Sequence, residues 1–370
     1  MIVIVAPEPS TWLLPLVSQV SKDGPVTIFA PWAHEQSAPR WLPSTLRRAL
    51  ERRRLATPTR LVTVPGFIAV QSLVRLWEKD DVAKRMTARF VLRRAVDAVA
   101  ARWLPREASM VYAPSCGAEN VLAVAAERGQ GGTLIEDVPN MRRFHADLDR
   151  AARVHPECVF LRRFRAPAAM VARQEAERVL AQRLLVRGAY ARDVLLELGV
   201  SEARIATLAA RVFPARHIEE HRARRYARDH QRVLLAGLAS ARGGSNEALS
   251  ALARTRDKRI TLLVHAGEGT EPRDLLAHPN VVRASKEERD KLKDVDAVLA
   301  PAWCESYPPE IARAHAMGIP VIATRHARGF TPVTREIEPG AALDFGALVS
   351  ARKGRANAIL DDLGGVLGGQ

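Results

Sequence analysis

Cysteine is scarce in this chain of 370 residues, which contains three in all. Cys116, Cys158 and Cys304 lie far apart and show neither Cys-x-x-Cys nor mixed His/Cys spacing. The sequence therefore predicts no disulfide framework and no zinc site, and it favours a reducing cytoplasm.

Long apolar runs are also missing. The first ten residues contain no basic region and their apolar run stops at Pro7, so we expect no signal peptide. No stretch approaches the roughly 18 to 20 apolar residues that a membrane-spanning helix needs. These absences predict a protein that is soluble in the cytoplasm, or at most peripheral to the inner face of a membrane.

Negative charge is under-represented, since 56 Lys and Arg against 41 Asp and Glu leave a net charge of +15. From Arg40 to Arg102, fifteen basic residues stand against five acidic ones, so +10 of that charge lies in one stretch. Aromatic residues make up only 5% and no nucleic-acid-binding motif is found, so we expect no nucleic-acid partner. A plain basic surface and an anionic membrane or acidic acceptor stay open as alternatives.

What the sequence has in abundance is alternation between short β-rich runs and helical stretches. A first series of predicted strands comprises Ile2–Val5, Val26–Phe29, Leu61–Val64, Met110–Tyr112, Thr133–Ile135, Leu184–Val186 and Arg204–Leu208. A second series comprises Val233–Ala236, Ile260–Val264, Val281–Arg283, Ala297–Ala300 and Pro320–Ala323. This alternation is typical of parallel sheets covered by helices on both faces.

Two successive series predict an α/β protein with two Rossmann-like βαβ domains, in keeping with the length of the chain. We place an N-terminal domain at residues 1–212 and a C-terminal domain at 213–370, because a charged helical patch at 217–231 separates the series. A basic insertion at about 40–104 interrupts the first series. Amphipathic helices and ordinary surface helices with snorkelling arginines both fit this insertion.

The most informative segment is Val295–Thr324, VDAVLAPAWCESYPPEIARAHAMGIPVIAT, which predicts strand, loop, helix and strand. The helix covers Pro309–Met317, because proline in the first turn and Gly318 after the end follow the usual asymmetry of helix termini. Its free N–H groups point into the preceding loop, where an anion would be stabilised. Glu305 lies just upstream, where a carboxylate can accept hydrogen bonds from a ribose diol.

This segment resembles the signature of the retaining GT-B glycosyltransferases of the group 1, or family 4, class, approximately E-[GS]-F-G-L-x-x-x-E-A-M-A-x-G-x-P-V-I-A-T. The residues in register are Glu305, Ser306, Tyr307, Ala314, Ala316, Gly318, Pro320, Val321, Ile322, Ala323 and Thr324. The resemblance implies a GT-B fold, with two Rossmann-like domains facing across a cleft. It also implies a glycosyltransferase that takes a nucleotide-sugar donor in its C-terminal domain and retains the anomeric configuration.

Other segments resemble the same family in the same order, so that the resemblance is clear over about residues 180–345. They are Leu184–Val200, Val233–Gly244, Leu262–Gly269 and His278–Ser285. The resemblance further implies that no cofactor and no catalytic metal are needed, since cations and helix dipoles neutralise the leaving diphosphate.

The chain departs from the family at its charged positions. The signature holds two glutamates eight positions apart, but here Glu305 is followed eight residues later by Arg313. Glu310 lies three positions before Arg313, so it does not occupy the position of the signature's second glutamate. The family's phosphate loop offers an arginine and a lysine, but Leu238 and Gly243 occupy those positions, which leaves Arg242 as the local cation.

We interpret Arg313 as supplying, from the helix, the positive charge that the loop has lost. The predicted catalytic residues are Glu305, Arg313 and Arg242. The predicted donor-binding residues are Ser306, Tyr307, Pro308, Pro309, Glu310, His265 and Ser285. On the acceptor side we predict Ser115, Asp137 and His145.

The first hypothesis is therefore a glycosyltransferase of carbohydrate biosynthesis with an unidentified acceptor. A second is a catalytically silent GT-B protein that acts as the partner or scaffold of a transferase. A third is a sugar-nucleotide epimerase, which would turn over a nucleotide sugar without any acceptor.

Overall fold

The computed structural model describes residues 1–33, 60–63, 82–208, 230–255, 259–265, 275–343 and 345. The chain divides into two compact units. Unit 1 comprises residues 1–145 and 163–210, and unit 2 comprises residues 146–162 and 211–370. The boundary predicted at 212/213, most of the basic insertion and all but the last two residues of the helical patch predicted at 217–231 lie outside the described residues; Gln231, predicted in that patch, begins a strand.

Unit 1 contains a seven-stranded parallel sheet in the order β3-β2-β1-β4-β5-β6-β7. Its strands are β1 (Ile2–Val5), β2 (Val26–Phe29), β3 (Arg60–Val62), β4 (Met110–Pro114), β5 (Gly131–Glu136), β6 (Arg183–Val186) and β7 (Ile205–Thr207). The inner strands are short and mostly apolar, as in β1, IVIV, whose four residues are all buried. Burial on both faces requires helices above and below such a sheet.

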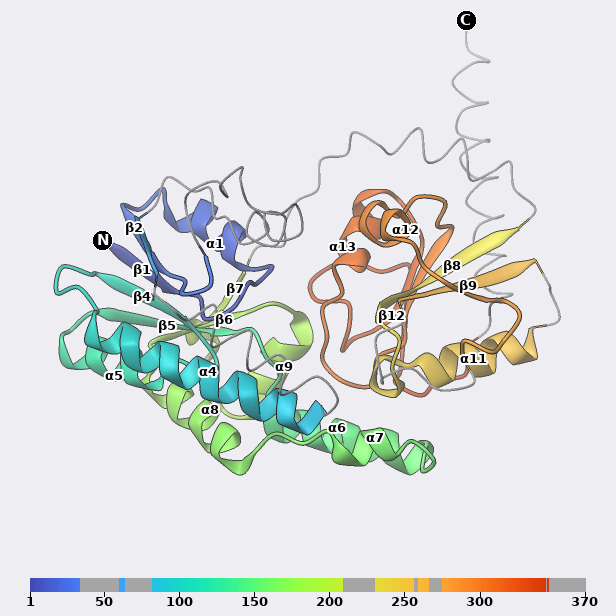
Figure 1. Ribbon diagram of the computed structural model, residues 1–370, viewed down its shortest axis with the longest axis horizontal. Coiled ribbons are helices and arrows are strands. Elements are labelled where there is room, and N and C mark those ends of the chain that lie inside the picture. Colours follow the sequence, from blue (N-terminus) through green and yellow to red (C-terminus); the bar gives the residue numbers. More distant parts are fainter. Residues whose placement is uncertain are drawn as a thin grey trace, which may run out of the picture. The chain divides into compact units, whose positions relative to one another are not determined.

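Helices cover both faces of this sheet (Figure 1). The helices of unit 1 are α1 (Leu13–Val20), α4 (Val82–Arg102), α5 (Glu119–Glu127), the start of α6 (Met141–Val154), the end of α7 (Val159–Arg163), α8 (Ala168–Leu180) and α9 (Ala189–Glu197), with the short η1 (Glu202–Arg204). Helix α1 packs its apolar side, including Leu13, Leu16 and Val17, into a core with β1 and β2. On the other face α4 contacts α5 and α5 contacts α8, which makes a helical layer.

Unit 2 contains a six-stranded parallel sheet in the order β10-β9-β8-β11-β12-β13. Its strands are β8 (Gln231–Leu238), β9 (Ile260–His265), β10 (Val281–Arg283), β11 (Ala297–Ala300), β12 (Val321–Thr324) and β13 (Arg335–Ile337). Its other elements are η2 (Ala241–Gly243), α11 (Ser245–Arg254), α12 (Lys286–Lys291) and α13 (Pro309–Ala316).

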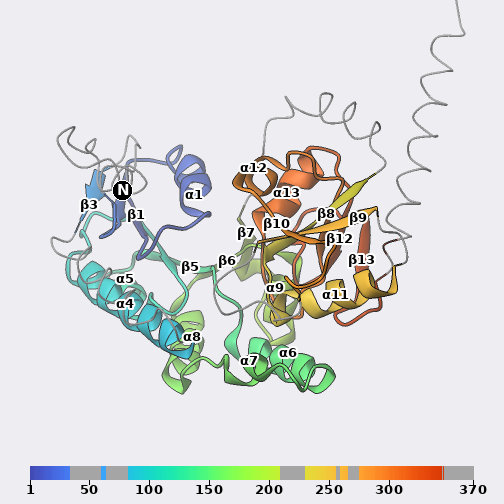
Figure 2. The same cartoon turned by 45° about the vertical axis from the view of Figure 1, so that its right-hand side comes forward.

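Alternate residues of the strands in unit 2 face two separate cores, as a period of two requires. Val233 and Leu235 pack with α11, whereas Leu234 packs with Ile311 and Ala314 of α13. Figure 2 shows α11 on one side of this sheet and α12 and α13 on the other.

The α/β fold class with two parallel sheets is confirmed, and each predicted strand corresponds to an observed one with small differences at the ends. Strand β13 was not predicted, because its residues Arg335–Ile337 are mostly exposed and lack an apolar run. No helix among the described residues has a stretch long and apolar enough to span a bilayer.

A segment from the middle of the chain belongs to unit 2. Residues 146–162, from α6 and α7, group with that unit, and the division falls within α6 between His145 and Ala146. His155 Nε2 lies 2.6 Å from a carboxylate oxygen of Glu247. The Asn246 side-chain amide donates a hydrogen bond to Cys158 Sγ at 3.1 Å. Both α11 residues thereby anchor the segment to the sheet of unit 2.

Candidate functional site

Each sheet reverses its strand order once, and the two reversals mark the places where parallel α/β sheets bind ligands. In unit 2 the order reverses between β8 and β11, and in unit 1 between β1 and β4. The loops that leave neighbouring strands in opposite directions open a crevice at the carboxyl ends of the strands. Polar and charged side chains gather at both edges.

In unit 2 a cavity of about 220 Å³ lies at this point. It is lined by Ala236, Gly237, Leu238, Ser240, Arg242, Gly243, Ala300, Ala302, Cys304, Ser306, Tyr307 and Pro308. These residues come from the carboxyl ends of β8 and β11 and from the loops that follow them. Of the described lining residues, Arg242 alone carries a charge.

The first loop of the cavity is built on glycine. Gly237 has a φ of +75° where the β8–β9 pairing shifts register, so the strand leaves its ladder before the loop begins. Gly244 has a φ of +84°, and a Cβ atom there would lie 2.2 Å from the Pro301 carbonyl oxygen. Ser240 caps the turn by accepting a hydrogen bond from the Gly243 N–H at 3.2 Å. Close packing of this loop on the exit of β11 therefore requires glycine at position 244.

The second loop leads into α13, which starts at Pro309 with Pro308 as its N-cap. Ser306, Tyr307 and Pro308 of this loop, which the sequence predicted to bind a donor, line the cavity. Glu305 is buried, and its carboxylate accepts a hydrogen bond of 2.7 Å from the Tyr307 hydroxyl. The carboxylate that the sequence singles out thus lies behind a tyrosine that faces the cavity.

Glu310 lies in the first turn of α13, and its side chain is buried. Burial raises the pKa of Glu310, against the opposing effects of its own backbone N–H, the charge of Arg313 and the Gly237 N–H. Because Gly237 lines the cavity, Glu310 supports the wall of the cavity from the helix side.

Arg313 lies outside the residues that line the cavity. Its Nη1 atom donates a hydrogen bond of 3.1 Å to the backbone carbonyl of Arg289 in α12. Arg289 in turn donates to the ring of His265, at 2.8 Å from Nε2, at the carboxyl end of β9. Burial and the neighbouring Arg289 charge lower the pKa of His265, so the ring is neutral and accepts the hydrogen bond.

Arg313, Arg289, His265 and Glu310 form a polar cluster that joins α12, α13 and the ends of β8 and β9. The sequence predicted three of these residues but missed Arg289, which lies in the charged helix KEERDK and carries no distinguishing signal. Ser285, predicted to bind the donor, is the N-cap of α12 and forms a capping box with Glu288. No group of three His, Cys, Asp or Glu side chains among the described residues is arranged to hold a metal ion.

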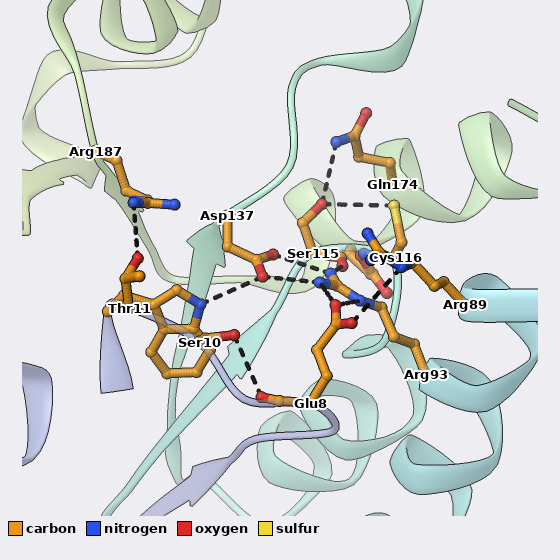
Figure 3. Close-up of polar contacts among 12 residues, drawn as sticks. Glu8, Ser10, Thr11, Arg89, Arg93, Ser115, Cys116, Asp137, Gln174 and Arg187 are labelled. Carbon is orange, nitrogen blue, oxygen red and sulfur yellow. Dashed lines mark hydrogen bonds and ion pairs between the residues drawn. The ribbon is translucent and has the colours of Figure 1, made fainter. Parts of the chain in front are cut away.

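Unit 1 carries its own polar cluster at the carboxyl ends of β1, β4 and β5 (Figure 3). The buried guanidinium of Arg93, from α4, lies between Glu8 and Asp137. It contacts Glu8 Oε1 at 2.5 Å and Asp137 Oδ2 at 2.9 Å, and it donates to the Ser115 carbonyl at 2.6 Å. Burial alone would lower the pKa of Arg93, but the charges of Asp137 and Glu8 outweigh it and raise that pKa.

The two carboxylates of this cluster differ in exposure. The side chain of Asp137 is 5% exposed, and Trp12 Nε1 donates to it at 3.3 Å, in addition to the two bonds from Arg93. The side chain of Glu8 is 26% exposed. Glu8 is therefore the carboxylate that a ligand can reach, and Asp137 and Arg93 hold it in place.

The other predicted acceptor residues lie deeper or elsewhere. Ser115 is fully buried, and its hydroxyl accepts a hydrogen bond from Gln174 at 3.1 Å. His145 Nε2 accepts a hydrogen bond of 2.9 Å from the Ala166 N–H, which fixes the chain before α8. The structure thus brings Asp137 and Ser115 together, and it gives His145 a role in local structure.

No protein-family model matches this chain, and no curated protein is similar to it in sequence. Solved structures are similar in fold. HepE from Anabaena, in complex with UDP and glucose, is 12% identical and matches 95% of this chain and 89% of its own, with a TM-score of 0.50. A glycosyltransferase from Rickettsia africae is 10% identical, with 95% and 87% covered and a TM-score of 0.53.

A trehalose-6-phosphate synthase, studied for glycosyl transfer with retention, is 10% identical, with 96% and 90% covered and a TM-score of 0.54. The similarity extends over nearly the whole chain in each case. The chain therefore has the GT-B fold that the sequence predicted.

Proposed function

We propose that this protein is a glycosyltransferase that takes a nucleotide-sugar donor at the carboxyl edge of unit 2 and an acceptor at the carboxyl edge of unit 1. The observation that carries the proposal is the cavity at the strand-order reversal of unit 2, with a glycine-built loop, one arginine and the start of a helix around it. Similar folds solved with UDP and glucose support a nucleoside diphosphate as the donor's common part.

In the donor site, Arg242 binds the diphosphate, and the first turn of α13 contributes its helix dipole to the same charge. Ser306 and Tyr307 offer hydroxyl groups to the sugar or the ribose. Tyr307 also links the bound donor to Glu305, whose carboxylate accepts a hydrogen bond from the Tyr307 hydroxyl. The leaving diphosphate is thereby stabilised by fixed charges and dipoles, and the reaction needs no metal ion.

Arg313 contributes positive charge from α13 and holds Arg289 and His265 through α12. In this arrangement Arg313 on α13 compensates for the lysine that the loop after β8 lacks. We expect transfer with retention of configuration, as the resemblance of the segment at 295–324 implies.

In the acceptor site, Glu8 accepts a hydrogen bond from a hydroxyl group of the acceptor. Arg93 and Asp137 are positioning residues, since they hold Glu8 and are themselves buried. Arg93 and Arg89, whose Nε atom lies 4.0 Å from Glu8, offset the charges of Glu8 and Asp137, so Glu8 acts as a hydrogen-bond acceptor within a charge-balanced cluster.

The decisive experiment is a donor panel with the purified protein. UDP, GDP, dTDP and their common sugars are tested by thermal shift, because a ligand of the folded state raises the melting temperature by mass action. Release of the nucleoside diphosphate is then measured with and without a panel of candidate acceptors. Release that depends on an acceptor supports a transferase, and no turnover of any donor by the folded protein would refute it.

The replacement of the signature's second glutamate by Arg313 favours one alternative, a catalytically silent protein that partners a transferase. Such a protein would bind a nucleotide sugar in the thermal-shift panel and release nothing. An epimerase would convert the donor without an acceptor and without releasing the diphosphate, so the same panel distinguishes all three functions.

A further inference from the structure

The solvent side of α4 in unit 1 is basic along its whole described length. The exposed residues that share this side, at spacings of three, four and seven, are Lys84, Val91, Arg94, Ala95, Ala98 and Arg102. At 100° per residue they fall within a stripe about 100° wide. Trp103 and Arg106, both exposed, follow the helix end. We call these eight residues the α4 face.

Within the described helix the α4 face contains no acidic residue because Asp97, the acid of that helix, points inward; after the helix end, the exposed Glu107 beside Arg106 borders the face. Asp97 is fully buried, accepts hydrogen bonds from the N–H groups of Asn120 and Val121, at 2.9 Å each, and pairs with Arg173. Arg93, the cation of the unit 1 cluster, is also buried on that inner side. The helix thus keeps its acid inside and presents Lys84, Arg94 and Arg102 to solvent.

The same face exposes apolar surface. Val91 is 57% exposed in the middle of the helix, and Trp103 is 48% exposed beside Arg102. A helix of 21 residues is about 30 Å long, so these side chains lie along an extended line. Exposed tryptophan beside arginine is typical of the headgroup region of a bilayer, and Val91 adds apolar surface to the same face.

We propose that the α4 face is a docking surface for an anionic lipid membrane, with the helix lying parallel to the bilayer. The cations bind the negative surface, and Val91 and Trp103 insert between headgroups. Each well-placed basic residue near such a surface increases binding by about fivefold. This proposal does not depend on the glycosyltransferase function, since lipid binding needs neither donor nor acceptor.

The chemistry of the face favours lipid over nucleic acid. Nucleic-acid surfaces add Asn, Gln and Ser side chains that bond to bases and sugars, beside their cations. The α4 face has none of these, and its remaining surface is alanine, valine and a single tryptophan.

Flotation with vesicles of phosphatidylcholine, alone or mixed with phosphatidylglycerol, tests the proposal on the full chain. We expect the protein to bind the anionic vesicles only. Binding should weaken as salt rises, because the screening length between charges falls to about 3 Å at 1 M salt. Reversing two cations, Arg94→Glu with Arg102→Glu, should reduce binding by about 25-fold or more. Quenching of tryptophan emission by brominated lipids should weaken in Trp103→Phe.

The matched control is Arg60→Glu with Arg183→Glu, which makes the same change of net charge at exposed positions at the amino ends of β3 and β6. Unfolding midpoints show whether each variant folds. Equal loss in both pairs would overturn the proposal in favour of a net-charge effect. Equal binding to neutral and anionic vesicles would also overturn it. So would a protein that binds RNA or DNA but no vesicles, and that loses this nucleic-acid binding in the variant Arg94→Glu with Arg102→Glu.

Discussion

At the scale of single residues, Arg242 is the cation that the cavity of unit 2 offers to a ligand. It lies in η2, directly after the glycine-built end of β8. Hydrogen bonds to a charged group contribute about 1.5–3 kcal/mol. We therefore expect Arg242→Ala to weaken binding of the nucleoside diphosphate roughly tenfold to 150-fold by calorimetry.

The control for Arg242 is Arg335→Ala, an exposed arginine at the amino end of β13 and so at the opposite edge of the same sheet. It should leave the affinity unchanged. Equal affinity of Arg242→Ala and the parent protein would show that the loop after β8 takes no part in binding the diphosphate.

Glu177, in α8, is a second residue with a measurable consequence. Its buried carboxylate accepts hydrogen bonds from the N–H groups of Cys116 and Ala118, at 2.5 and 2.7 Å. Burial raises its pKa from 4.5 to about 7, although these two bonds and Arg173 oppose the shift. The folded state therefore binds a proton that the unfolded state releases between these pH values.

The contribution of Glu177 to stability is accordingly complete below about pH 4.5 and is lost as pH rises through about 7. A shift of this size corresponds to at most about 3 kcal/mol. Urea unfolding at pH 5 and pH 8 should show a smaller loss of stability in Glu177→Gln than in the parent. The control is Glu175→Gln, an exposed position on the same helix, which should keep the parent's pH dependence of stability. If stability changes with pH equally in all three proteins, Glu177 is not the group whose titration causes the change.

At the scale of elements, the strands were predictable because strands of parallel sheets buried on both faces are short and mostly apolar. Ile2–Val5, Val281–Arg283 and Ala297–Ala300 agree with the observed bounds residue for residue. The loops after these strands were less predictable. The positions of Ser306 and Tyr307 on the cavity could be inferred from the signature, but no local pattern indicates that Glu8 and Arg93 pair, since they are 85 residues apart.

Gly244 decides the shape of the loop between β8 and α11. Gly244→Ala would place a Cβ atom in a left-handed conformation and 2.2 Å from the Pro301 carbonyl oxygen. Gly129 has a similar φ, +67°, but nothing lies within 4 Å of a Cβ atom there. We expect Gly129→Ala to cost about 1–2 kcal/mol, the strain of the left-handed conformation alone.

Gly244→Ala adds a steric clash to this strain and should cost about 3–5 kcal/mol. Its binding of the nucleoside diphosphate should fall as well, because the loop lines the cavity. Thermal and urea unfolding compare the two alanine variants directly. Equal losses would mean that the loop moves away from Pro301 at no cost, and that its packing on β11 is not required.

The pairing of α12 with α13 depends on Arg313. Arg313→Glu breaks its hydrogen bond to the Arg289 carbonyl and places a second carboxylate one turn after Glu310, whose pKa burial already raises. We expect this variant to lose donor binding. Gly243→Lys combined with Arg313→Glu should recover part of it, since a Cβ atom at Gly243 would meet its neighbours at 3.2 Å and needs only a small adjustment.

Arg313→Lys is the matched control, because it keeps the charge and loses the planar guanidinium. It should bind the donor more weakly than the parent and more strongly than Arg313→Glu. Parent-like affinity of Arg313→Glu in calorimetry would refute the role of this charge, and it would favour the catalytically silent protein.

At the scale of the whole molecule, the chain does not divide into units in simple sequence order. Residues 146–162 precede the last two strands of unit 1 in sequence, yet they group with unit 2. A boundary drawn from the two strand series cannot reveal this, because α6 is one continuous helix. The attachment depends on Glu247 in α11, which is buried and is contacted by His155 and by the Trp303 indole N–H at 2.7 Å.

Glu247→Ala should therefore loosen the segment and α11 together. It leaves the buried Trp303 N–H without its acceptor, at a cost of about 1–3 kcal/mol. Hydrogen exchange should show faster exchange in both residues 146–162 and 245–254, while α1 and α5 of unit 1 keep their protection. Glu157→Ala is the control, because the Glu157 side chain is 66% exposed and lies 3.5 Å from His155 Nδ1. Exchange that increases in α11 alone, or equally in Glu157→Ala, would show that Glu247 does not hold the segment to unit 2.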